Sequence, residues 1–312
     1  MLPGQRFIED RIVGALRAWM IVGILLKVTR VRDRFDGLSL VYYSTPWPVL
    51  AFGFLLLAAH NYRRARWHPM RRYIAFTVVA LFTWIATSWY SAEPVPGEAE
   101  VRLVQWNVDR PVDRFDRCVK WLRAQNPDII CLSEAEPEET RTRDLWQREF
   151  PGYRLLPGAM NMLCLVRGEV ASSVGLTLGA SSYGALHRVR IRGREINVLQ
   201  VDVIALPSRS RKVQLAKLAE IANAHPNGNL IIVGDFNTPR ESAHLDALRG
   251  KFNHAFEVAG RGLAETWPSL APALSIDHIW LGATWQPLTC HHGWSWLSDH
   301  RPVVVDLATT AR

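Results

Sequence analysis

The chain divides into two parts that differ in how hydrophobic and polar positions alternate. Residues 38–59 and 73–90 are apolar and carry no charge, whereas the later part alternates short apolar runs with polar segments. These stretches approach the length that an α-helix needs to cross a bilayer at about 1.5 Å rise per residue. Trp and Tyr near their ends are typical of membrane interfaces. Pro46 and Pro48 would kink the first stretch, which membrane helices tolerate. We expect two transmembrane helices here, and favour them over core helices of a soluble protein.

A third apolar segment, residues 12–28, is interrupted by Arg17. It could span the bilayer, lie in its interface or act as an uncleaved signal anchor. The segment between the two longer stretches, residues 60–72, carries five arginines, and the positive-inside rule assigns it to the cytoplasm. This orientation predicts a multi-pass protein of the cell membrane with residues 93–312 on the extracytoplasmic side. Four basic residues oppose it, because they would lie in the outer loop if residues 12–28 span the bilayer: Lys27, Arg30, Arg32 and Arg34.

The net charge of +8 comes entirely from the first part of the chain. Residues 1–92 contain 12 basic and 4 acidic residues, which leaves 25 of each sign in residues 93–312. A neutral second part gives no electrostatic support for non-specific nucleic-acid binding. The lipid bilayer is the partner that the first part predicts, and nucleic acid stays an option without support from charge.

The second part has the pattern of an α/β domain. Residues 93–100 read as a linker, and residues 101–312 alternate apolar strands with polar helices. Helical spacing predicts helices over 112–125 and 209–225. Strands are expected over 101–108, 127–134, 162–167, 186–193, 195–204, 230–233, 275–281 and 301–307. Many strands with helices between some of them indicate an α/β sandwich of two packed sheets with helices outside.

The four cysteines have spacings that fit no zinc motif. Cys131 and Cys164 lie within apolar strand patterns, so we expect buried thiols. A disulfide remains an alternative for a domain outside the cytoplasm.

Polar residues stand where the apolar runs end. Asp235 and Asn237 follow the run 230–233, and similar positions are occupied by Asn107, Glu134, Asp277, Asp299 and His300. If these strands share sheets, their ends can converge on one rim. Residues two apart on an extended chain point the same way, which would bring Asp235 and Asn237 together. Taken singly, each has an ordinary alternative: a turn at Asp235–Asn237, a solvated strand end at Glu134, a loop at Asp299–His300.

Carboxylate and amide oxygens without cysteine suit a hard divalent cation. Mg²⁺ is the expected cofactor, with Mn²⁺ as an alternative. Such a cation beside Asp, Asn and His is suited to phosphoester hydrolysis, because it neutralises phosphoryl oxygens while a carboxylate takes a proton from water.

The ordered blocks "WNV", "PDIICLSE", "GDFNTP", "SIDHI" and "SDHRPV" resemble the endonuclease/exonuclease/phosphatase superfamily over roughly residues 100–310. The hydrophobic segments before them are similar to those of membrane-attached bacterial members. The resemblance implies a four-layered α/β sandwich, with two mainly antiparallel sheets flanked by helices, behind a helical membrane anchor (residues 1–92). It implies metal ligation by Glu134 with Asn107 and Asp299 beside the metal, and catalytic roles for Asp235, Asn237, Asp277 and His300.

Two further positions are substrate-binding candidates on the same resemblance. Asn161 matches a residue at the start of the central strand. Asp202 stands where the family usually has a phosphate-stabilising His, and a carboxylate there would repel phosphate unless it is protonated or binds a second cation. An alignment shifted by a residue or two is the alternative. We therefore expect a membrane-anchored, Mg²⁺-dependent phosphodiesterase acting on a lipid head group, nucleotide or nucleic acid. The alternative is a catalytically impaired binding domain on the same scaffold.

Overall fold

The computed structural model of the protein describes residues 3–135, 140–206, 208–225 and 228–310 and separates into two compact units. The first unit comprises residues up to Trp89 with the short segments Leu206–Ser210 and Glu241–Ala243. The second unit contains the remaining residues, from Tyr90 onward.

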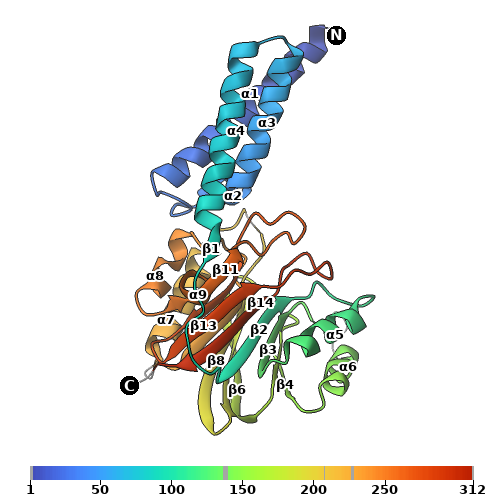
Figure 1. Cartoon of the computed structure of the whole chain (residues 1–312), viewed down its shortest axis with the longest axis vertical. Coiled ribbons are helices and arrows are strands. Elements are labelled where there is room, and N and C mark those ends of the chain that lie inside the picture. The colour runs from blue at the N-terminus through green and yellow to red at the C-terminus, as the bar shows by residue number, and fades with distance from the viewer. Residues whose placement is uncertain (1–2, 136–139, 207, 226–227, 311–312) are drawn as a thin grey trace. The chain divides into compact units, whose positions relative to one another are not determined.

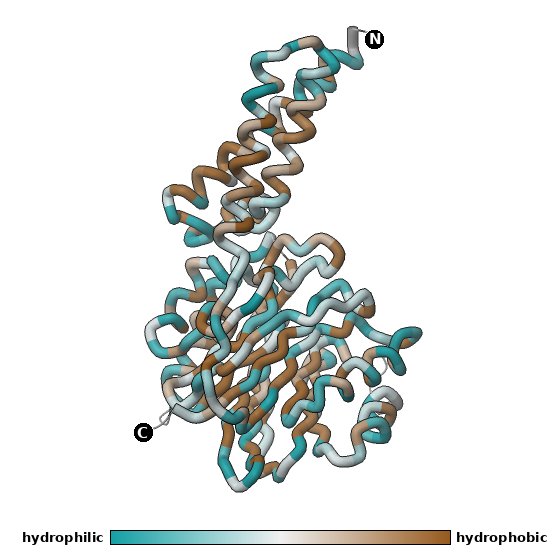
Figure 2. Tube along the Cα trace, in the orientation of Figure 1, coloured by the Kyte–Doolittle hydropathy of each residue, from teal (hydrophilic) through white to brown (hydrophobic). Residues whose placement is uncertain are grey.

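The first unit is helical (Figure 1), with α1 (Pro3–Val28), α2 (Leu38–Ser44), α3 (Trp47–Arg63) and α4 (Trp67–Ser88). Met20 of α1 packs with Leu50 and Phe54 of α3 in its small core. A Cβ at Gly53 would come within 2.8 Å of the Met20 sulfur, so the missing side chain allows the close approach of α1 and α3. Many other apolar side chains of these helices are exposed; Phe82 is 74% and Ile12 63% exposed. Figure 2 shows the hydrophobic residues of these helices in brown.

The kink expected at Pro46 and Pro48 is a complete break between two helices. The chain breaks at Thr45 and Pro46 into α2 and α3, because proline lacks a backbone N–H and forces the residue before it out of helical geometry. The second stretch begins earlier than expected, at Trp67, and its last residues pass into the short strand β1 (Trp89–Ser91). Within the described residues, no helix alone combines the length and apolarity of a membrane span. Only α2 and α3 taken together meet that criterion, with a bend of 75° between them.

The second unit contains two mixed sheets. In spatial order, the eight-stranded sheet consists of β1, β11 (Gly260–Leu263), β13 (Trp285–His292), β14 (Val303–Thr309), β2 (Val101–Asn107), β3 (Ile129–Ser133), β5 (Leu163–Val166) and β4 (Arg154–Pro157). The six-stranded sheet consists of β10 (Asn253–His254), β12 (Asp277–Leu281), β9 (Leu230–Asp235), β8 (Arg194–Asp202), β7 (Ser182–Ile191) and β6 (Glu169–Gly179). The pairs β2–β3, β8–β9 and β11–β13 are parallel, and most other pairs are antiparallel.

Alternation along the strands divides the second unit into layers. Leu103 of β2 and Val198 of β8 belong to the apolar cluster between the two sheets. Their neighbours point the other way: Val104 packs in the cluster with α5 (Phe115–Gln125) and α6 (Thr140–Glu149), and Leu199 in the one with α7 (Lys212–Ala224) and α8 (Asp246–Arg249). The remaining short helix, α9 (Ala255–Ala259), packs in the central cluster. The predicted α/β sandwich is therefore confirmed.

The predicted linker, residues 93–100, runs along the second unit. Its backbone joins the eight-stranded sheet through Val95 N to Leu288 O (3.0 Å) and Glu100 N to Leu307 O (2.9 Å). The four cysteines are buried free thiols, as expected, with the Cys131 and Cys164 sulfurs 4.0 Å apart.

Buried histidines predict a protein that loses stability in mild acid. His187 of β7 is fully buried with Nδ1 2.9 Å from the Ser173 hydroxyl, and burial lowers its pKa from 6.5 to about 4. Between pH 6.5 and about pH 4, the unfolded chain therefore binds a proton at His187 and the folded chain does not. We expect His187 to cost about 3 kcal/mol of unfolding free energy as the pH falls from 7 to 4. Denaturant unfolding at a series of pH values measures this loss. In His187→Gln the pH dependence is shallower, and an unchanged slope would contradict the assignment.

Candidate active site

The predicted site residues lie where the inward faces of the strands end. Val101 and Leu103 of β2 face the other sheet, and the same alternation carries on to Gln105 and Asn107. In β9, Ile231 and Val233 are followed on the same face by Asp235. Three further positions continue an inward face in the same way: Ser133, Asp202 and Asp277. Polar residues therefore line the end of the apolar core, where the facing strands of the two sheets terminate.

Three aspartates form a row across neighbouring strands of the six-stranded sheet. Asp235 is the register partner of Asp202 in the parallel strand β8 and of Asp277 in the antiparallel strand β12. Asp235 and Asp277 are buried, and Asp202 is half-buried. Burial and mutual repulsion disfavour three negative charges at this spacing. The pKa of Asp202 therefore lies well above its ordinary value; burial is the largest cause, followed by the charges of Asp235 and Glu134.

Asp235 lies at the centre of the cluster. Its Oδ2 accepts a hydrogen bond from Asn107 Nδ2 (3.0 Å), and its Oδ1 accepts one from the Asn237 backbone N–H (2.8 Å). Burial and the Asp277 charge outweigh these bonds and raise the pKa of Asp235 to about 7. At neutral pH the group is thus poised to exchange a proton, which suits a general base.

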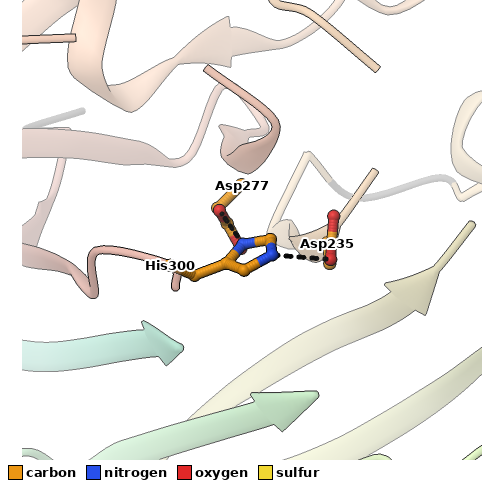
Figure 3. Close-up of side chains that lie close together, drawn as sticks. All are labelled: Asp235, Asp277 and His300. Atoms are coloured by element: carbon orange, nitrogen blue, oxygen red, sulfur yellow. Dashed lines mark hydrogen bonds and ion pairs between the residues drawn. The ribbon is translucent and has the colours of Figure 1, made fainter. Parts of the chain in front are cut away.

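His300 is held between two aspartates, as Figure 3 shows. Its Nδ1 lies 2.9 Å from Asp277 Oδ2, and its Nε2 lies 3.9 Å from Asp235 Oδ2. Burial disfavours a charge on this imidazole, but the carboxylates of Asp277 and Asp235 outweigh burial and raise the pKa of His300 to about 10. The ring is therefore a cation at neutral pH, with Nδ1 directed to Asp277 and Nε2 facing the cluster.

Glu134 joins the cluster through Asn107. The Asn107 amide donates to Glu134 Oε1 (3.2 Å) as well as to Asp235, so one side chain bridges the ends of both sheets. Glu134 has a left-handed backbone, φ 52°, just beyond the end of β3. Its other oxygen, Oε2, lies 3.0 Å from the exposed Arg110 guanidinium.

Asn237 lies near Asp235 for a different reason than the one predicted. Strand β9 ends at Asp235, and Asn237 has a left-handed backbone, φ 47°. The Asp235 side chain accepts from the Asn237 backbone, which is the turn that the sequence offered as an alternative. The Asn237 amide donates to Val203 O (2.8 Å), and Val203 is the first residue after the neighbouring strand β8. The extended-chain argument for this pair is therefore wrong, although the two residues are in contact.

The two remaining predicted residues lie at the edge of the cluster. Asp299 is exposed; its Oδ2 accepts from Trp267 Nε1 (3.0 Å), and its Oδ1 lies 4.0 Å from His300 Nε2. Asn161 is half-buried with φ 64°, and its backbone oxygen accepts from Ala135 N (2.9 Å), next to Glu134.

Residues outside the predicted set fix this geometry. Ser298 Oγ donates to Asn107 O (2.7 Å) and accepts from His300 N (3.0 Å), which ties the last loop to the end of β2. The buried Gln200 amide donates to Leu132 O (2.9 Å), joining the two sheets directly below the cluster. Both lie two positions before a predicted site residue, and that spacing is the signal that could have identified them. Arg110 has no comparable signal in the sequence.

Comparison with known proteins agrees with this arrangement. The model of the Endonuclease/Exonuclease/phosphatase family matches residues 104–300, which is more than half of the chain. The chain belongs to this family. The family comprises hydrolases of phosphate esters, and the match includes all of the cluster from Asn107 to His300.

The individual proteins that resemble this chain have low sequence identity to it. The Escherichia coli (strain K12) protein YbhP, described as uncharacterized, is 33% identical over 140 residues. That match covers 41% of this chain, and the chain spans about half (54%) of the length of the curated relatives it matches. Two solved structures share the fold with a TM-score of 0.57: D. rerio TDP2 complexed with single strand DNA product (16% identity, 67% of this chain and 99% of that one), and the Bacteroides thetaiotaomicron mannosyl-6-phosphatase Bt3783 (14%, 67% and 99%).

The residues present fit the divalent cation that the family usually uses. The ligand atoms of Asp235, Asp277 and His300 lie within 4.8 Å of one another, which is close enough to hold a metal ion. With Nδ1 of His300 directed to Asp277, the same three residues also form an acid–base group. Glu134 offers carboxylate oxygens to a cation, with the Asn107 amide beside them. Asp277 Oδ1 is buried without a hydrogen-bond partner, and the acidic groups outnumber the cations His300 and Arg110, so the cluster has an excess of negative charge that a cation would balance.

The glycine of the family's "GDFN" block has a specific packing reason. Gly234 has φ 152°, and a Cβ there would come within 1.9 Å of the Val201 backbone oxygen in β8. We expect Gly234→Ala to destabilise the fold by about 3 kcal/mol and to displace Asp235 from its neighbours. Gly250→Ala is the matched control, because nothing lies within 4 Å of its added Cβ. Urea denaturation of both variants measures the difference, and equal stabilities would contradict the packing argument.

Proposed function

We propose that this chain is a membrane-anchored phosphodiesterase that hydrolyses its substrate with water and a divalent cation, Mg²⁺ or alternatively Mn²⁺. The observation that carries the proposal is the connected set at the mouth of the sandwich. Glu134 contacts Asn107, Asn107 contacts Asp235, and His300 lies between Asp235 and Asp277. Oxygen donors, a base near neutrality and a buried cation are the parts that phosphoester hydrolysis needs.

The cation, when bound by Glu134 with Asn107 and Asp299 beside it, supplies neutralising charge to the phosphate. Asp235, whose pKa is about 7, accepts a proton from the attacking water. The water oxygen forms a bond to phosphorus, the ester P–O bond breaks, and solvent protonates the leaving alkoxide. His300, kept charged by Asp277, donates from Nε2 to a phosphoryl oxygen as negative charge develops there.

Asp202 favours a second candidate function, a binding domain of reduced activity. It occupies the end of β8 on the inward face, where no histidine of the described chain substitutes for it. His187 lies in the middle of β7 opposite Val198, and His225 follows α7 near the opposite ends of the strands. The raised pKa of Asp202 favours the protonated form, which donates a hydrogen bond to phosphate instead of repelling it.

Replacing Asp202 tests which candidate holds. We expect Asp202→His to raise turnover up to about tenfold, because the imidazole donates to the phosphate without depending on protonation of a carboxylate that would otherwise repel it. The measurement is steady-state hydrolysis of bis(p-nitrophenyl) phosphate with Mg²⁺. The matched control Asp116→Asn alters an exposed carboxylate on α5 and leaves the rate unchanged. Loss of activity in Asp202→His would show that the carboxylate has a role of its own.

The exposed apolar side chains of α1, α3 and α4 support the membrane anchor. Exposed apolar side chains in this number are unfavourable in water and suit lipid. Arg64 pairs with Glu9 and Asp10, so the N-terminal end of α1 lies beside the basic turn between α3 and α4. A cytoplasmic basic turn would then give three passes and an extracytoplasmic second unit. Protease digestion of intact and opened cells tests this orientation.

A substrate panel tests the activity. Intact protein with Mg²⁺ is offered a chromogenic phosphodiester, a phosphomonoester, single- and double-stranded DNA, and phospholipid vesicles. Cleavage of a diester that EDTA abolishes supports the proposal. Binding of phosphate esters without cleavage of any class would favour the binding domain.

A further inference from the structure

Two loops beside His300 expose large apolar side chains. Loop A comprises residues 264–276, between β11 and β12, and loop B comprises residues 293–302, between β13 and β14. Leu270 of loop A is 64% exposed, and Trp294 and Trp296 of loop B are 55% and 70% exposed. Figure 1 shows both loops, in orange and red, projecting from the sheets at the end where β14 begins. This is also the end that carries His300, which is itself part of loop B.

The fold holds these loops in place. Ser269 of loop A donates from its backbone to Asp299 O (2.7 Å) and from its hydroxyl to Ser298 O (2.7 Å). Arg301 N donates to Thr266 O (2.8 Å), so the loops are joined at two places next to the active site. The Arg301 guanidinium lies 4.9 Å from the centre of the Trp294 ring. The exposure of the apolar side chains is therefore a property of a fixed surface.

The charge of the loops favours a lipid bilayer over nucleic acid as the partner of this surface. Residues 266–276 and 293–298 carry no charge, and Glu265, His300 and Arg301 are buried. The one exposed charged residue of the two loops, all of whose residues the structure describes, is the acidic Asp299. Single-stranded nucleic acid also stacks on aromatic rings, but it binds where basic side chains follow its backbone. Loops that expose Trp and Leu and no basic side chain instead match the interfacial region of a bilayer, where the indole ring is favoured.

We propose that loops A and B are a docking surface for a lipid bilayer, which holds the active site at the membrane surface. The inference rests on the proposed function, because it assigns that site a substrate carried by or lying at a lipid surface. A second observation supports lipid as the occupant: the helices of the first unit expose apolar side chains of their own, so the chain already carries lipid-compatible surface. Docking by Trp294, Trp296 and Leu270 needs no anionic lipid, because it does not depend on charge.

The buried native thiols make this surface accessible to a site-specific label. All four cysteines are buried, so a cysteine introduced at an exposed position reacts selectively. The full chain is prepared as Trp296→Cys and, as the matched control, Val213→Cys on α7, which is also 70% exposed in the wild-type chain. Each variant is labelled with an environment-sensitive nitrobenzoxadiazole and reconstituted in phosphatidylcholine vesicles that contain nitroxide-labelled phosphatidylcholine.

The label at position 296 is expected to shift to shorter wavelength and to be quenched about twofold by the nitroxide, while the label at 213 keeps the emission of an aqueous probe. Equal quenching at the two positions would overturn the proposal. A shift at 296 that appears only on addition of a single-stranded oligonucleotide would overturn it in favour of nucleic acid. Because the quenching requires no turnover, failure of the hydrolase proposal would be recognised separately, by inactivity towards soluble and lipid esters alike.

Discussion

Glu134→Gln is expected to reduce hydrolysis about a thousandfold, equivalent to about 4 kcal/mol of transition-state stabilisation. The substitution keeps the shape of the side chain and its contact with Asn107 while removing the carboxylate charge that a divalent cation requires. Since Glu134 is half-buried and just beyond the end of β3, the fold should tolerate the change. The measurement is the rate of bis(p-nitrophenyl) phosphate hydrolysis at saturating Mg²⁺, with unfolding followed in parallel.

The matched control is Glu220→Gln on α7, a more exposed carboxylate that pairs with Lys217 and lies outside the cluster. Its activity should equal that of the wild-type chain. If Glu134→Gln retained full activity, Glu134 would be excluded from the site. If it lost activity only because it unfolded, the denaturation curves would show this.

Asp277→Asn is expected to lower kcat about a hundredfold with a smaller change in KM. Asp277 contributes the 2.9 Å hydrogen bond and the largest favourable charge that keep the buried His300 protonated. Without that charge, burial dominates and the pKa of His300 falls, so the imidazole no longer stabilises negative charge on the phosphate. Separate kcat and KM values at neutral pH, with Mg²⁺ saturating, provide the measurement.

Asp116→Asn serves again as the control for loss of a carboxylate charge, because Asp116 is exposed on α5. A kcat for Asp277→Asn equal to that of the control would show that the charge on His300 is not used in the reaction. A rise in KM alone would assign Asp277 to substrate binding instead.

The positions of Asn107, Asp235 and Asp277 could be predicted because they stand at the edges of apolar strand patterns. Glu134 also stands at such an edge, but alternation alone puts Ser133 on the inward face of β3, so the left-handed backbone at Glu134 was needed as well. A run such as residues 230–233 fixes the strand, and alternation fixes the inward face, so the polar residue at its end has few places to lie. What the pattern cannot give is the register between strands. That Asp202, Asp235 and Asp277 form one row follows from pairings between segments distant in sequence.

Other features escaped prediction for physical reasons. Strand β6 is largely exposed and β13 contains a proline and polar residues, so neither has the apolar pattern of a buried strand. The break between α2 and α3 was underestimated, because proline is tolerated within membrane helices and the sequence alone does not give the size of a bend. The contact between Arg110 and Glu134 depends on a left-handed backbone at residues 109, 110 and 134. The sequence around these residues gives no sign of that conformation.

The most direct test of the account is a metal titration of the intact protein. Metal-free protein is titrated with Mn²⁺ while hydrolysis of bis(p-nitrophenyl) phosphate is followed. A cluster that uses its carboxylates to hold one cation beside a charged His300 predicts a rate near zero without metal that rises to saturation with Mn²⁺. A rate that is the same with and without metal would contradict the account.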